Sequence, residues 1–118
     1  MSGNLDYSIS LSVKNNSDEV MEALHRAEAR IFEMWGIKAQ GYATEYAPVD
    51  TGNLRSSIGY KTDTPNNTTY IGTDVEYATY QEFGTYKMAA HPFLKPALAD
   101  HLKEYEGIII GETAKELK

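Results

Sequence analysis

The feature that most constrains this chain is a long run of apolar residues at helical spacing. They recur every three or four residues between positions 18 and 46, which predicts one amphipathic helix. Ser17 is suited to cap its start, and Pro48 disfavours helical geometry at the residue before it. At 1.5 Å per residue the helix would be ~43 Å long, longer than the sheet that a small domain places beneath it. We therefore expect part of its apolar stripe, including Trp35 and Tyr42, to face a neighbouring subunit. The stripe consists of Val20, Leu24, Ala27, Ile31, Met34, Trp35, Tyr42 and Tyr46.

Other segments predict a small sheet and two further helices. Apolar and polar residues alternate between positions 5 and 13, as in a half-buried strand. Two further strands, at 57–62 and 69–73, are joined by a turn. A short helix is expected at 75–83 and a C-terminal helix from the prolines at 92 and 96 onward, with the glycine-flanked isoleucines at 107–111 compatible with helix or strand. The expected fold is α+β, a long amphipathic helix packed on a small, mainly antiparallel sheet, in a single domain over residues 1–118.

Composition and missing motifs argue against several classes of binding and catalytic function. The net charge of −6 argues against sequence-independent binding of DNA, which needs clustered basic residues. The chain has no cysteine, and its three histidines lack metal-ligand spacing, so neither a metal nor a cofactor is expected. Phosphate-loop and hydrolase-serine motifs are absent from the sequence. No apolar run reaches the ~18 residues of a membrane helix, so no membrane partner is expected.

Three short signatures between residues 46 and 98 combine turn residues with apolar anchors. The first is Ala47-Pro48-Val49-Asp50-Thr51-Gly52-Asn53-Leu54-Arg55-Ser56-Ser57-Ile58. The second is Tyr77-Ala78 followed by Glu82-Phe83-Gly84-Thr85, and the third is Pro92-Phe93-Leu94 followed by Pro96-Ala97. Physically, Asp50 is expected to cap a short helix, Gly52 and Gly84 to permit turns, and Phe83 and Phe93 to anchor loops to the core.

In this order and spacing, the signatures resemble those of the neck and tail-completion proteins of long-tailed bacteriophages, over roughly residues 20–105. The resemblance implies a structural subunit without catalytic residues that forms a ring, often a hexamer, at the head–tail junction or the tail end. Such a ring joins head to tail, contacts other neck or tail proteins, and lets DNA pass without binding it specifically. The expected location is the virion, after assembly in the host cytoplasm. The residues that carry the resemblance are Pro48, Asp50, Thr51, Gly52, Leu54, Arg55, Ser57, Ile58, Tyr77, Ala78, Glu82, Phe83, Gly84, Thr85, Pro92, Phe93, Leu94 and Pro96.

Closing a ring requires two different patches on each subunit. We expect the long helix, through Trp35 and Tyr42, to supply one patch. The unpatterned loop at 85–91, with Tyr86, Lys87 and Met88, would supply the other.

Two alternative functions remain open on the sequence. Asp50-Thr51-Gly52 is the tripeptide of aspartic proteases, which as small chains act as homodimers, and Ile109-Ile110-Gly111 falls where such enzymes carry an apolar element. Against this, a helix and a proline precede Asp50, Glu112 replaces the expected arginine, and no glycine-rich flap lies between the two motifs. The second alternative is a non-viral binding or adaptor module, which would differ in its stoichiometry.

Overall fold

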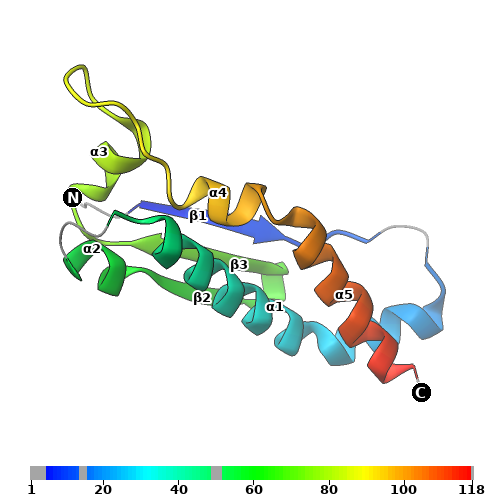
Figure 1. The fold of residues 1–118 in the computed structure, drawn as a ribbon. Coiled ribbons are helices and arrows are strands. Elements are labelled where there is room, and N and C mark those ends of the chain that lie inside the picture. Colours follow the sequence, from blue (N-terminus) through cyan, green and yellow to red (C-terminus); the bar gives the residue numbers. More distant parts are fainter. Residues whose placement is uncertain (1–4, 14–15, 49–51, 118) are drawn as a thin grey trace.

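The computed structural model describes residues 5–13, 16–48 and 52–117, and it has the α+β architecture that the sequence predicted. One long helix lies across a small antiparallel sheet, and shorter helices complete the fold (Figure 1). Asp50 and Thr51 lie outside the described residues. The elements are β1 (Leu5–Ser10), α1 (Asp18–Tyr46), α2 (Gly52–Ser57), β2 (Gly59–Asp63), the 3-10 turn η1 (Thr64–Asn66), β3 (Thr68–Thr73), α3 (Ala78–Phe83), α4 (Lys95–Ala99) and α5 (Leu102–Glu116).

Helix α1 has the limits that its sequence pattern predicted. The Ser17 hydroxyl accepts a hydrogen bond from the Val20 amide at 3.2 Å, which satisfies one of the free donors of the first turn. Asp18 and Glu19 place negative charge at the same end, where the helix dipole favours it. At the other end, Ala47 is extended, as expected for a residue before proline.

The sheet has the strand order β1-β3-β2, and both pairings are antiparallel. Tyr7 of β1 and Tyr60 of β2 both lie opposite Ile71 of the central strand. Ile71 and Thr69 belong to the face that α1 covers, and the Thr69 hydroxyl donates a hydrogen bond to the Phe32 carbonyl at 2.9 Å. Asn67 closes the turn between β2 and β3 in the left-handed region, with φ of 54°.

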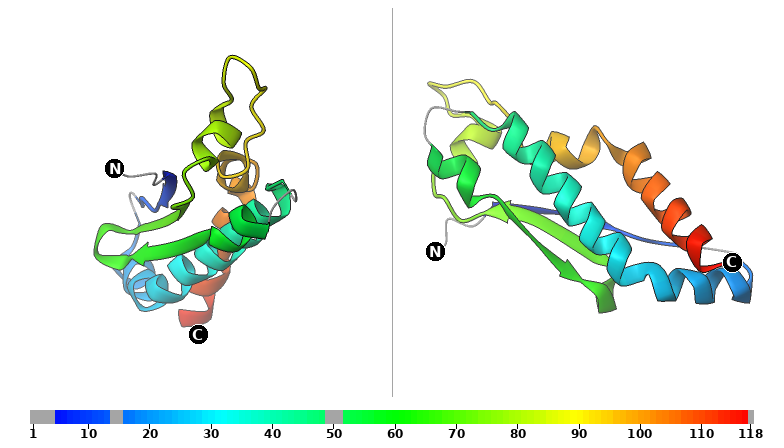
Figure 2. Two further views of the ribbon diagram at one scale, coloured as in Figure 1. Left: turned by 90° about the vertical axis from the view of Figure 1, so that its left-hand side faces the viewer. Right: turned by 60° about the horizontal axis from the view of Figure 1, so that its bottom comes forward.

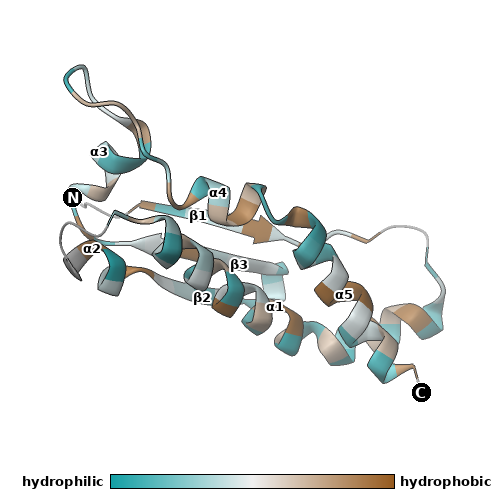
Figure 3. Cartoon of the chain, viewed as in Figure 1, coloured by the Kyte–Doolittle hydropathy of each residue, from teal (hydrophilic) through white to brown (hydrophobic). Residues whose placement is uncertain are grey.

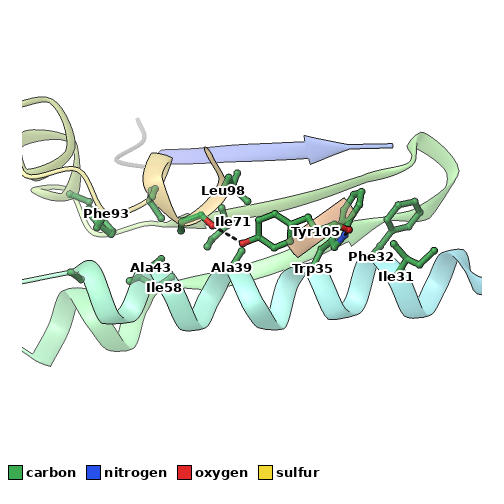
Figure 4. Packing of buried hydrophobic residues seen from close by; sticks show 14 of the residues in the cluster. Ile31, Phe32, Trp35, Ala39, Ala43, Ile58, Ile71, Phe93, Leu98 and Tyr105 are labelled. Atoms are coloured by element: carbon green, nitrogen blue, oxygen red, sulfur yellow. Dashed lines mark hydrogen bonds between the residues drawn. The ribbon is translucent and has the colours of Figure 1, made fainter. Parts of the chain in front are cut away.

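The core lies between α1, the inner face of the sheet and the C-terminal helices (Figure 4). Trp35 is 1% exposed, and its indole N–H donates to the Tyr105 carbonyl at 3.0 Å. Tyr105 in turn donates its hydroxyl to the Ala97 carbonyl at 2.6 Å, so α1, α5 and α4 are held together by one buried chain of contacts. The expectation that Trp35 faces a neighbouring subunit is therefore wrong for this fold, because α5 covers that part of the stripe.

The C-terminal region forms two helices where the sequence pattern suggested one. Helix α4 ends at Ala99 and α5 begins at Leu102, and residues 107–111 are helical. Arg26 and Arg30 of α1 pair with Glu112 and Glu116 of α5 at 2.8–3.2 Å, along the seam between the two helices. Helix α5 thus supplies much of the cover that the long helix would otherwise lack.

The molecule is elongated, with principal extents of 54 × 26 × 23 Å. Helix α3 and the loop after it project from one end, while the start of α1 and the end of α5 lie at the other (Figures 1 and 2). The described helices include none that is long and apolar enough to cross a membrane.

Candidate assembly surfaces

The first signature docks α2 against the end of α1 and the start of the sheet. Leu54 and Ile58 are buried in the core. Arg55 donates from its Nε to the Thr44 carbonyl of α1 at 2.9 Å. Ser57 donates its hydroxyl to the Leu54 carbonyl at 2.7 Å. The capping role expected of Asp50 lies outside the described residues, but the rest of this signature is built into packing contacts.

One buried carboxylate joins the second and third signatures. Glu82 is buried at the end of α3, and its Oε1 accepts from the amides of Phe93 and Leu94, each at 3.0 Å. Its Oε2 accepts from the Lys95 amide, also at 3.0 Å. Burial, and then the charge and hydrogen bond of Glu82, raise the pKa of the nearby Tyr7 phenol. Glu82 therefore ties α3, the entrance of α4 and the first strand together.

The turn after α3 requires a glycine. Gly84 has a φ of +78°, and a Cβ there would lie 2.8 Å from the Ala90 nitrogen and 2.8 Å from the Met88 oxygen. Thr85 and Met88 exchange backbone hydrogen bonds at 2.8 and 3.2 Å. The His91 amide donates to the Gln81 carbonyl at 2.7 Å. We name residues 77–91 the arm; its base is closed by these bonds and by Glu82.

The outer surface of the arm is rich in exposed large side chains. Tyr86 is 93% exposed, and the Lys87 ammonium lies 5.4 Å from the centre of its ring. Phe83 is 59% exposed, so the expectation that it anchors the loop to the core is wrong, whereas Phe93 is fully buried. The exposed large side chains of the arm are Tyr77, Tyr80, Phe83, Tyr86 and Met88.

Tyr42 is engaged within the chain. Its ring stacks on His101, with centroids 3.5 Å apart and planes 2° apart, and its hydroxyl donates to the Glu104 carboxylate. That hydrogen bond, with smaller contributions from burial and neighbouring negative charge, raises the pKa of Tyr42 to about 12. Bonds from Lys38 and then Tyr42 hold the pKa of Glu104 below its usual value. Tyr42 thus contacts His101, which lies between α4 and α5, and Glu104 of α5. Its role in a subunit contact stays a prediction.

A second apolar surface lies at the end of the molecule away from the arm. The first turns of α1, the residues just before them and the second half of α5 line a groove of about 300 Å³ there, which we name the α1/α5 groove. Ile110, 67% exposed, is one of its large side chains. The groove was not expected from the sequence, although the apolar residues of the C-terminal helix recur at helical spacing. Its lining is Val13, Asn16, Val20, Leu24, Ile109, Ile110, Thr113, Ala114 and Leu117.

The described residues do not assemble the features of an aspartic protease. Ile109 to Gly111 lie within α5, not in an apolar strand. The segment before the aspartate is the end of α1, not a strand. Within the described ranges, no group of three or more histidine, aspartate or glutamate residues is placed to hold a metal ion.

The signatures therefore build a packed scaffold and an exposed arm. A family model described as "Bacteriophage HK97-gp10, putative tail-component" matches residues 7–84, well over half of the 118 residues. The chain belongs to this family of phage tail components, as its resemblance predicted. Its role is structural, within the virion and in contact with other tail proteins. Searches of curated proteins and of solved structures found no match.

Proposed function

We propose that this tail component is a single-domain subunit of a ring at the head–tail junction or at the tail end. The ring joins head to tail and leaves a channel for DNA. The observation that carries the proposal is the arm, a projection with a hydrogen-bonded base that exposes Tyr77, Tyr80, Phe83 and Tyr86.

The construction of the arm supports a role in assembly. Aromatic side chains that stay in water bury little apolar surface in a monomer, whereas tyrosine, phenylalanine and methionine are enriched where protein surfaces meet. The base of the arm is held by Glu82 and by the turn at Gly84. Holding a contact loop in place before binding lowers the entropy lost on association.

The charge of the chain supports an open channel. A net charge of −6 repels phosphate, so DNA would slide past such subunits without being retained. Other tail proteins, and further copies of this chain, are then the partners of the arm.

The test is the mass of the assembly in solution, by sedimentation velocity and native mass spectrometry. We expect the unmodified chain at high concentration to form a closed oligomer with a single copy number. A Tyr86→Ala/Met88→Ala double variant should shift toward monomer while keeping its helical circular dichroism. Tyr70→Ala, on the exposed face of β3, is the matched control and should assemble normally. An unchanged oligomer in the double variant would refute a role for the arm, and a chain that stops at a dimer would favour an adaptor module.

A further inference from the structure

We propose that the tip of the arm of one copy docks in the α1/α5 groove of the next copy. This inference rests on the proposed ring and names the two surfaces that close it. The tip consists of Tyr86, Lys87 and Met88, and the occupant of the groove is a second copy of this chain.

The groove is apolar and lacks a cover within the described part of the chain. Val20 and Leu24 of α1 line one side, and Ile109 and Ile110 of α5, with Leu117 just after its end, line the other. Hydrophobic colour marks the first turns of α1 and the middle of α5 at this end of the molecule (Figure 3). An exposed apolar groove of this kind gains free energy when another apolar surface removes it from water.

The two surfaces lie at opposite ends of a molecule whose long axis measures 54 Å (Figure 1). The arm of a subunit therefore cannot fill the groove of the same subunit. When the arm of one copy fills the groove of another, each subunit uses both patches, and the contact is head-to-tail. Contacts of this type close into rings when the rotation between neighbours permits.

The charges of the two surfaces are complementary. Lys87 is the only formally charged residue among positions 83–91, with histidine neutral, so the tip is positive. On the α1 side of the groove, residues 18–28 carry four acidic residues against one arginine. On α5, Glu106 lies one helical turn before Ile110 and so on the same face. Glu106 is exposed, and we assign it as the partner of Lys87.

The size of the groove also suits the tip. A volume of about 300 Å³ is at the lower limit of the cavities that hold small ligands, and it offers space for one or two large side chains. Tyr86 and Met88 flank Lys87, which allows an aromatic or thioether group to enter while the ammonium stays at the rim.

Disulfide trapping tests the contact directly, because the natural chain has no cysteine. Tyr86→Cys and Ala114→Cys proteins are mixed under mild oxidation; Ala114 lines the groove and is exposed. We expect a covalent pair that contains one of each variant. Lys61→Cys on β2, which is exposed but outside the groove, is the matched control and should not trap the arm.

Charge reversal provides the second test. Lys87→Glu and Glu106→Lys should each raise the concentration needed for assembly by about tenfold, the effect of one interfacial charge contact. The double variant Lys87→Glu/Glu106→Lys should recover most of that loss, which a merely structural role of either residue would not produce.

The outcomes separate this inference from the proposed ring. If the chain forms a closed oligomer but Tyr86→Cys traps Lys61→Cys as readily as Ala114→Cys, the docking site is wrong and the ring stands. Additive losses in the double charge variant would exclude the pairing of Lys87 with Glu106 and leave the ring intact. A chain that neither oligomerises nor traps at high concentration would overturn both.

Discussion

Replacement of Glu82 by glutamine tests how the arm is attached to the body. The two carboxylate oxygens accept three backbone N–H groups at 3.0 Å, two at Oε1 and one at Oε2. Glutamine keeps one acceptor oxygen and turns the other position into a donor, so the Lys95 amide would face an N–H₂ group. Hydrogen bonds to charged groups contribute about 1.5–3 kcal/mol each, and the two remaining bonds weaken when the charge is lost. Because removal of a buried charge offsets part of this, we expect Glu82→Gln to lower the free energy of unfolding by about 2–3 kcal/mol.

Urea unfolding followed by fluorescence measures this change, since the one tryptophan of the chain, Trp35, is buried in the core. Hydrogen exchange of the Phe93, Leu94 and Lys95 amides should accelerate in parallel. Glu76→Gln is the matched control, because Glu76 is exposed and the same chemical change should be nearly neutral there. A loss below about 0.5 kcal/mol with unchanged amide protection would refute the reasoning.

Three further predictions concern the long helix. Gly36→Ala should destabilise the protein by about 1–3 kcal/mol in urea unfolding, because its Cβ would overlap the Tyr60 ring. Gly41→Ala, where a Cβ meets nothing within 4 Å, should instead stabilise it by about 1 kcal/mol through helix propensity, and a loss there would contradict this account. Tyr42 should ionise near pH 12 by tyrosinate absorbance, read as the difference from Tyr42→Phe. Since the folded pKa is raised from 10.0, its stabilising contribution is full below pH 10 and is lost as the pH rises through about 12; an unshifted midpoint would exclude the bond to Glu104.

Local patterns anticipated the parts of the fold that depend on near neighbours in sequence. Ser17 and Pro48 delimit α1 because capping and proline geometry act over a few residues. The alternation of β1 likewise identified its half-buried face, because the side chains of a strand alternate from one residue to the next. The roles of Phe83 and Phe93 were not separable in this way: Phe83 precedes Gly84 and Phe93 follows Pro92, so each stands beside a turn residue, yet Phe83 is exposed and Phe93 is fully buried.

Helical spacing likewise placed Trp35 and Tyr42 on one stripe but could not show what covers it. The cover of the stripe is α5. The indole of Trp35 donates a hydrogen bond to the carbonyl of Tyr105 in that helix, which lies 70 residues further along the sequence. The glycines at 107 and 111 left the local preference between helix and strand undecided. In the structure this segment is helical, and ion pairs with Arg30 and Arg26 join α5 to α1.

By itself, the sequence determined the α+β class, the limits of the long helix, and membership of a phage tail-component family, because periodicity, caps and short signatures are local properties of the chain. Only the tertiary structure decided that Glu82 ties two signatures together, that Trp35 is internal, and that the arm and the α1/α5 groove lie at opposite ends. These facts depend on which distant segments meet, and a distant contact leaves no periodic trace in the residues that make it.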